Sequence, residues 1–214
     1  MKNTLAAIVI LSALLLYGCE PAATFDQPQP SDTKSINSFP ERLQATYVDE
    51  DLASTLTISD QLITRQYHFD LKQHKDSLGS SYKLLGDTLI NLTNVEKEKI
   101  TFKGDTVIQH ITSEDTLFNI SANNVLKKFK GYYFLNIRYS DSAWEIKSLS
   151  LQKGRLTIGS ISSTEDLQKL QEITETAADT VTHFTLTNRQ FKKFVRQDGF
   201  AAQEIFTRIA ENRR

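Results

Sequence analysis

Apolar and polar residues alternate along the middle of the chain, between Leu43 and Ile161. Within this region Ile63, Phe69 and Leu71 fall on one face of an extended segment. Alternation with a period of two is typical of antiparallel strands that bury one face. The pattern predicts roughly nine or ten strands in an antiparallel meander. Turn-forming residues separate the strands at Ser59-Asp60, Gly86-Asp87, Gly104-Asp105, Ser113-Glu114-Asp115, Ser140-Asp141 and Lys153-Gly154.

A meander of this size usually curls or closes, because open strand edges recruit other chains. We therefore predict a mainly β (α+β) fold with a curled or barrel-like sheet, whose closed form would be a lipocalin-like barrel. Trp144 and Ile146 are in phase with each other, whereas Leu149 and Leu151 are shifted by one residue. A β-bulge near Lys147-Ser148 would reconcile the two halves of this strand.

Helical signals appear in residues 162–214, which we expect to form a mixed α/β segment packed on the β domain of residues 39–161. Ser163-Thr164-Glu165-Asp166 is typical of a helix N-terminus. An apolar stripe follows it, made of Leu167, Leu170 and Ile173. Residues 182–186 are predicted to be a strand, and residues 203–210 fit either a strand or a helix.

A second helix is predicted to begin after Thr187, with Gln190 at the capping-box position and Gly199 as its C′ residue. Its inward residues would be Phe191, Phe194 and Val195. The opposite face carries Arg189, Lys192, Lys193 and Arg196. Such a cationic strip fits anionic head groups or an acidic partner, although a solvated helix face has the same composition.

The composition changes abruptly near residue 38. All four prolines lie between Pro21 and Pro40, among Gln, Ser, Asp and Thr, and Phe25 and Ile36 are almost the only apolar residues there. A segment of this composition buries little apolar surface, so residues 19–38 are predicted to be a flexible Pro/Gln/Ser linker.

The N-terminus carries the most specific motif in the chain. Lys2 precedes an apolar run from Leu5 to Leu16, which would span about 18 Å as a helix and is too short to cross a ~30 Å hydrocarbon core. The run ends in Leu16-Tyr17-Gly18-Cys19. Residues 1–18 therefore predict a signal peptide, and the ending resembles the lipobox of bacterial lipoproteins.

Membership of that family implies cleavage before Cys19 and acylation of its thiol, so the partner would be the membrane, through a lipid anchor. In some Gram-negative bacteria an Asp after the modified Cys retains a lipoprotein in the inner membrane. Here the residue is Glu20, so the resemblance implies an exported protein of the outer membrane, on either its periplasmic or its surface face. The layout is similar to that of small uncharacterised envelope lipoproteins.

Charge and cysteine content exclude several classes of function. The 214 residues contain 25 Lys and Arg against 26 Asp and Glu, which does not favour nucleic acid as a partner. A single Cys rules out an internal disulfide framework and any CxxC site. We find no catalytic motif and expect no cofactor and no metal.

Six tripeptides share the form Asp-Ser/Thr followed by an aliphatic residue, where random placement would give about one. They resemble the acceptor of a general O-glycosylation system that some Gram-negative bacteria apply to exported proteins. Asp also stabilises turns and Thr begins strands, which would explain the same pattern. The candidate acceptors are Ser77, Thr88, Thr106, Thr116, Ser142 and Thr180.

His68 and Asp70 are two residues apart, so one strand presents both on the same face. His110 lies on a neighbouring strand of the predicted meander. Such a group can bind zinc or act as an acid–base pair, although a solvated polar strand face has the same pattern.

Three functions remain open from the sequence. The first is a non-catalytic binding or interaction module held at the membrane, with an envelope protein as its partner. The second is a lipocalin-like carrier of an apolar ligand, and the third is an envelope hydrolase that uses His68 and Asp70. We predict the first.

Overall fold

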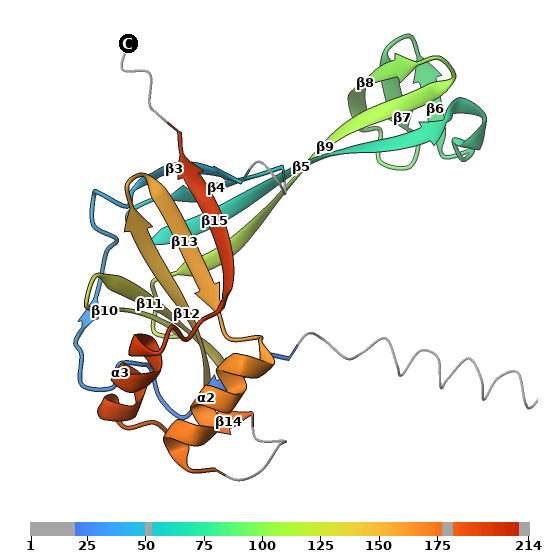
Figure 1. The fold of residues 1–214 in the computed structure, drawn as a ribbon. Helices are drawn as coiled ribbons and strands as arrows, with labels where there is room; N and C mark the ends of the chain where they lie inside the picture. Colours follow the sequence, from blue (N-terminus) through green and yellow to red (C-terminus); the bar gives the residue numbers. More distant parts are fainter. Residues whose placement is uncertain (1–19, 50–52, 177–181, 210–214) are drawn as a thin grey trace, which may run out of the picture. The chain divides into compact units, whose positions relative to one another are not determined.

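The computed structural model describes residues 20–49, 53–176 and 182–209 (Figure 1). The chain forms two compact units that interleave along the sequence. Of the described residues, unit 1 contains those within 20–36, 121–150 and 157–204, and unit 2 contains those within 37–120, 151–156 and 205–209. The expected division between residues 161 and 162 is therefore not a boundary, because the C-terminal helices share unit 1 with strands from the middle of the chain.

The predicted fold class is confirmed. The structure is mainly β, with a 15-stranded sheet whose order is β2-β10-β11-β12-β13-β15-β3-β4-β5-β9-β8-β7-β6 and in which β1 pairs with β12 and β14. The pairs among β10, β11 and β12 and among β3, β4, β5, β9 and β8 are antiparallel, whereas β1 and β14 are parallel. Over the described residues the order begins at β2 and ends at β6, so the sheet is not closed and the lipocalin-like barrel does not form.

Unit 1 combines the first part of this sheet with both helices. Its elements are β1 (Thr24–Phe25), β2 (Ser35–Ile36), β10 (Asn124–Phe129), β11 (Tyr132–Ser140), most of β12 (Ala143–Gln152) and β13 (Arg155–Ser160), α2 (Thr164–Thr174), β14 (His183–Phe184), α3 (Asn188–Arg196) and the start of β15 (Ala202–Arg208). Residues 203–208 are thus in a strand, which settles the ambiguity left by the sequence.

The helices of unit 1 pack on strands β11 and β12. Phe134 and Ile146 join Leu170 of α2 and Phe191 of α3 in one buried apolar cluster. Both predicted N-caps are confirmed: the Ser163 hydroxyl accepts from the Asp166 N–H, and Thr187 forms the capping box with Gln190.

Gly199 has a different role from the one predicted. The left-handed residue after α3 is Asp198, with φ 54°, whereas Gly199 is required by packing. A Cβ at position 199 would lie 2.4 Å from the Phe194 ring, so only glycine leaves room for this buried aromatic side chain.

The N-terminal segment contradicts the prediction of a flexible linker. Ala23 and Phe25 are buried, and β1 pairs with β14 and, at Trp144, with β12. Gln29 is fully buried: its N–H donates to the Asn136 Oδ1 at 2.6 Å, and its C=O accepts from the Asn136 Nδ2 at 3.0 Å. Residues 23–36 therefore belong to the folded unit.

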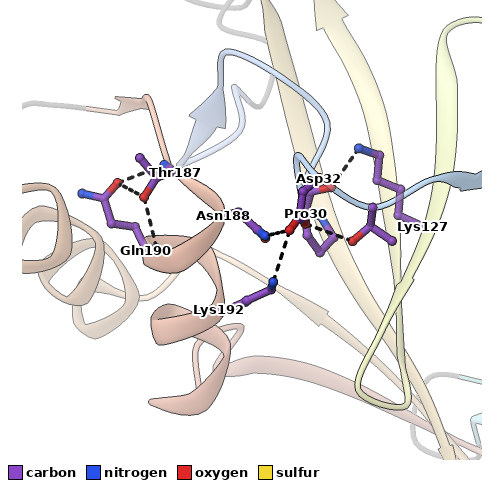
Figure 2. A network of polar contacts seen from close by, with 8 residues as sticks. Pro30, Asp32, Lys127, Thr187, Asn188, Gln190 and Lys192 are labelled. Carbon is purple, nitrogen blue, oxygen red and sulfur yellow. Dashed lines mark hydrogen bonds and ion pairs between the residues drawn. The ribbon is translucent and has the colours of Figure 1, made fainter.

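A second set of polar contacts holds the same segment to β10 and α3 (Figure 2). The Lys127 ammonium donates to the carbonyls of Pro28 at 3.0 Å and Pro30 at 2.9 Å. Burial lowers the pKa of Lys127, and the nearby Asp32 carboxylate partly opposes this effect. Asp32 itself accepts from Asn188 and pairs with Lys192 of α3 at 3.3 Å. These polar contacts add to the apolar burial of Ala23 and Phe25 in holding the segment.

Unit 2 contains the rest of the sheet, in the order β3-β4-β5-β9-β8-β7-β6. Its buried residues include Tyr47, Leu56, Ile63 and Phe118. The elements are β3 (Ala45–Asp49), β4 (Ser54–Ile58), β5 (Leu62–His74), the 3-10 helix η1 (Lys75–Ser77), β6 (Tyr82–Leu85), β7 (Thr88–Asn91), β8 (Lys97–Lys103) and β9 (Thr106–Asn119), with the end of β15.

Two local predictions are wrong. Ser113-Glu114-Asp115 is not a turn, because β9 continues through it in register with β5, from Tyr67↔Ser113 to Arg65↔Asp115. The bulge near Lys147-Ser148 is also absent: β12 pairs regularly with β11 there, and the irregularity lies between Arg138 and Ser140. Ile146 and Leu149 are both buried, so β12 is covered on both faces and the phase of its apolar residues changes without a bulge.

Candidate functional site

A β-arm, defined here as residues 68–113, extends from unit 2. Strands β5 and β9 pair continuously from Leu62↔Asn119 to His74↔Thr106. β4 pairs with β5 only as far as Tyr67, and β8 pairs with β9 only as far as Gln109. Between these limits β5 and β9 form a two-stranded ribbon, which Figure 1 shows running to β6, β7 and β8.

The ribbon brings together the three predicted polar residues on one face. Asp70 lies opposite His110 in the register, and its Oδ1 is 2.7 Å from the His110 Nδ1. His68 lies one step along the same face, with its Nδ1 3.3 Å from the Thr112 hydroxyl. The sequence analysis missed Thr101, whose hydroxyl is 3.2 Å from the His110 Nε2.

Asp70, His110 and Thr101 thus form a carboxylate–imidazole–hydroxyl chain on an open surface. The side chains of Asp70 and His110 are 42% and 57% exposed. They line a shallow depression together with His68, Lys72 and Thr112. Within the described ranges, no group of three or more His, Cys, Asp or Glu residues has a geometry suited to a metal ion. The arrangement can exchange protons and can present hydrogen-bonding groups to a partner, in competition with water.

The opposite face of β5 carries two uncovered apolar side chains, Phe69 at 51% and Leu71 at 45% exposure. Phe102 of β8, farther along the same face, is 45% exposed. The sequence placed Phe69 and Leu71 on the same face as Ile63, which is fully buried. The face changes from buried to exposed along β5 because the core of unit 2 ends before the ribbon begins.

The distal end of the β-arm has a small core of its own. Leu89, Ile100 and Val107 are buried against one another, and Leu78 and Leu84 pack on them. Two exposed ion pairs support it: Lys75 with Asp105 at 2.5 Å, and Lys99 with Asp87 at 2.6 Å. Their lysines lower the pKa values of Asp105 and Asp87, mainly by hydrogen bonding.

The Asp-Ser/Thr tripeptides occupy different local structures. Thr88, Thr106 and Ser142 follow the Asp of a tight hairpin turn. Thr116 instead lies within β9, and Ser77 lies in η1. A turn therefore explains why Asp precedes the hydroxyl residue at three of the sites. No turn explains Asp115 before Thr116. The remaining candidate, Thr180, lies outside the described residues.

The cationic strip on α3 is only partly free. Arg189, Lys193 and Arg196 are exposed, whereas Lys192 pairs with Asp32 and stacks over the Phe129 ring at 5.1 Å. Figure 2 shows this lysine directed toward the N-terminal segment. Lys192 therefore serves the internal contacts of unit 1.

Cys19 and the predicted signal peptide lie outside the described residues. No helix in the described part of the chain has the length and apolar character that a membrane crossing requires. Comparisons with protein-family models, with curated proteins and with solved structures find no match.

Proposed function

We propose that the chain is an exported lipoprotein, anchored at Cys19, that acts as a non-catalytic interaction module of the bacterial envelope. The apolar run and the Leu16-Tyr17-Gly18-Cys19 ending support the anchor. Two or three acyl chains would hold the protein stably at the membrane, whereas one would bind only marginally. Outer-membrane residence follows from Glu20 after the modified cysteine.

The β-arm is the element that binds the partner, and its exposed ribbon is the observation that carries this proposal. A two-stranded hairpin is only marginally stable in water by itself. Here the ribbon leaves Phe69 and Leu71 half exposed on one face and a polar group around Asp70 on the other. Exposed apolar side chains of this kind form the centre of protein interfaces, and the polar groups of the other face and of the strand edge can add hydrogen bonds to the partner. The partner we propose is a protein of the envelope.

The carrier and hydrolase hypotheses have less support. A carrier of an apolar ligand needs a sheet that encloses a cavity, and the sheet order over the described residues is open. The hydrolase hypothesis gains from the contact between Asp70 and His110. That pair lies on a solvated surface, however, which would not exclude water from a bound substrate.

Photo-crosslinking in the native host tests the proposal. A photoreactive amino acid replaces Phe69 in the full-length chain, and Tyr139, which is 49% exposed in the β11–β12 region of unit 1, is the matched control. We expect a discrete protein adduct from position 69 and none from position 139. Equal adducts from both positions, or none from either, would contradict the role of the β-arm.

The anchor is tested separately by the intact mass of the mature chain. We expect acyl groups on the wild-type protein and their loss in Cys19→Ala. A mature chain without acyl mass would contradict the anchor and would leave the evidence on the β-arm unaffected.

A further inference from the structure

Among the described residues, no strand pairs with the outer edge of β5 beyond Tyr67. Over the described residues, β4 is the strand that pairs with this edge, and its pairing ends at Ser54↔Tyr67. The His68 N–H still donates to the Ala53 C=O on this side, at 3.0 Å. Alternate residues of a strand direct their N–H and C=O groups to the same side. The backbone groups of Asp70 and Lys72 therefore point outward from this edge.

We propose that a second copy of this chain pairs with the edge, antiparallel, about a two-fold axis at Leu71. The inference rests on the proposed function, because it names the partner of the β-arm. Isologous pairing of identical surfaces is the commonest arrangement of soluble oligomers. Adding a strand to an open sheet edge is an established way in which β-proteins recognise one another.

The backbone limits the registers that are available to the two copies. Residues of even number direct hydrogen-bonding groups to this edge. The His68 N–H already bonds to Ala53, which excludes the register with Asp70 opposite His68. Asp70 can then lie opposite Asp70, His74 or Lys72 of the partner subunit. With Asp70 opposite Asp70, two carboxylates face each other. With Asp70 opposite His74, Lys72 lies opposite Lys72 of the partner subunit, and two ammonium groups face each other. Like charges directly opposite are destabilising in a ladder, whereas opposite charges are stabilising. Only the third register, centred on Leu71, pairs each Asp70 with a Lys72.

This register also buries the exposed apolar residues. Leu71 meets Leu71 of the partner subunit as a non-hydrogen-bonded pair, with Cα atoms about 4.5 Å apart. Phe69 of each copy lies on the same face, beside the central leucines. Two hydrogen-bonded residue pairs, Asp70 with Lys72 in both directions, would each exchange two backbone hydrogen bonds.

The charges decide whether this edge attracts or repels a strand. A lysine on an edge strand usually opposes strand addition, because its ammonium must lose water without a partner. Here the partner supplies a carboxylate. On its own chain, His110 contacts the Oδ1 of Asp70, so the Oδ2 can accept from the incoming Lys72.

Disulfide trapping in the native envelope tests the pairing. Cys19 is the only native cysteine and its thiol is acylated under the proposed function, so Leu71→Cys adds the one reactive thiol. Cα atoms about 4.5 Å apart fall within disulfide geometry. Phe69→Cys is the control: it is equally exposed, but the two copies of residue 69 would lie ~13 Å apart. We expect a covalent dimer from position 71 and none from position 69.

Charge exchange tests the register. On the Leu71→Cys background, Asp70→Lys alone sets lysines against lysines, and Lys72→Asp alone sets carboxylates against carboxylates. Each variant expressed alone should lose at least ten-fold of the covalent dimer. Co-expression of the two variants should restore it, as a heterodimer with opposite charges at both positions.

The outcomes separate this inference from the proposed function. Equal dimer from positions 69 and 71, or insensitivity to the charge changes, would overturn the paired edge. A photo-adduct between position 69 and a different protein, without a dimer from Leu71→Cys, would overturn self-pairing and leave the β-arm as the interaction element. Absence of both would overturn both proposals.

Discussion

Asn136→Ala is the sharpest perturbation of the N-terminal segment. Asn136 is fully buried, and its amide donates to the carbonyls of Gln29, Val125 and Phe134 at 3.0–3.1 Å. Its Oδ1 accepts from the buried Gln29 N–H at 2.6 Å. Truncation would leave that N–H without its partner, and the three carbonyls would lose one bond each.

These losses set the expected magnitude. A buried N–H without a partner costs roughly 1–3 kcal/mol, and the lost carbonyl contacts add further increments of up to about 1 kcal/mol each. We expect Asn136→Ala to lower the free energy of unfolding of unit 1 by about 3–5 kcal/mol. Because natural domains are stable by only about 5–15 kcal/mol, this loss is large.

Urea unfolding of the protein, followed by tryptophan fluorescence, measures the effect. Trp144 is the single tryptophan, it is 7% exposed, and it lies opposite Phe25 of the N-terminal segment. The matched control is Asn123→Ala, at an exposed bend of unit 1, where we expect a change within about 0.5 kcal/mol. A loss below about 1 kcal/mol for Asn136→Ala, with residues 23–36 still resistant to protease, would refute the role assigned to this amide.

Three further predictions concern packing, pH and modification. Gly199→Ala should destabilise unit 1 by about 1–3 kcal/mol, because its methyl group would overlap the Phe194 ring. The control Gly79→Ala has open space around the new methyl group and should not destabilise the protein. Equal unfolding midpoints for the two variants would contradict the packing argument. Burial lowers the pKa of Lys127, so the unfolded chain binds this proton more tightly than the folded chain does. The free energy of unfolding of wild type, relative to that of Lys127→Met, should therefore rise as pH increases toward 10.5. A difference that stays constant with pH would contradict this prediction. In a glycosylating host, Thr116→Val should remove one glycan increment from the intact mass, and an unchanged mass would contradict modification at this strand position.

Local chemistry made part of the fold predictable. The turns at Gly86-Asp87 and Gly104-Asp105, and the helix caps at Ser163 and Thr187, depend on residues close in sequence. Alternation likewise placed Asp70 on the same strand face as His68. These features can be predicted because each depends on only a few residues that are close in the sequence.

Long-range partners made the rest unpredictable. The composition of residues 19–38 indicated a linker, because the side chains that hold the segment, Lys127 and Asn136, lie about a hundred positions away. Alternation also assigned Phe69 and Leu71 to a buried face, since it shows which residues share a face but not where the covering layer ends. Thr101 escaped notice because its neighbour His110 is reached only through the β8–β9 register.

Hydrogen exchange of the full-length protein in envelope membranes of its host, compared with the purified protein at high dilution, tests the central claim most directly. If the β-arm is the interaction element, amides of residues 68–74 and 110–113 exchange more slowly in the membranes, by at least ten-fold. Residues 140–142 at the β11–β12 turn, also exposed, serve as the control and exchange at the same rate in both samples. Equal exchange of the β-arm in the two samples would contradict the claim.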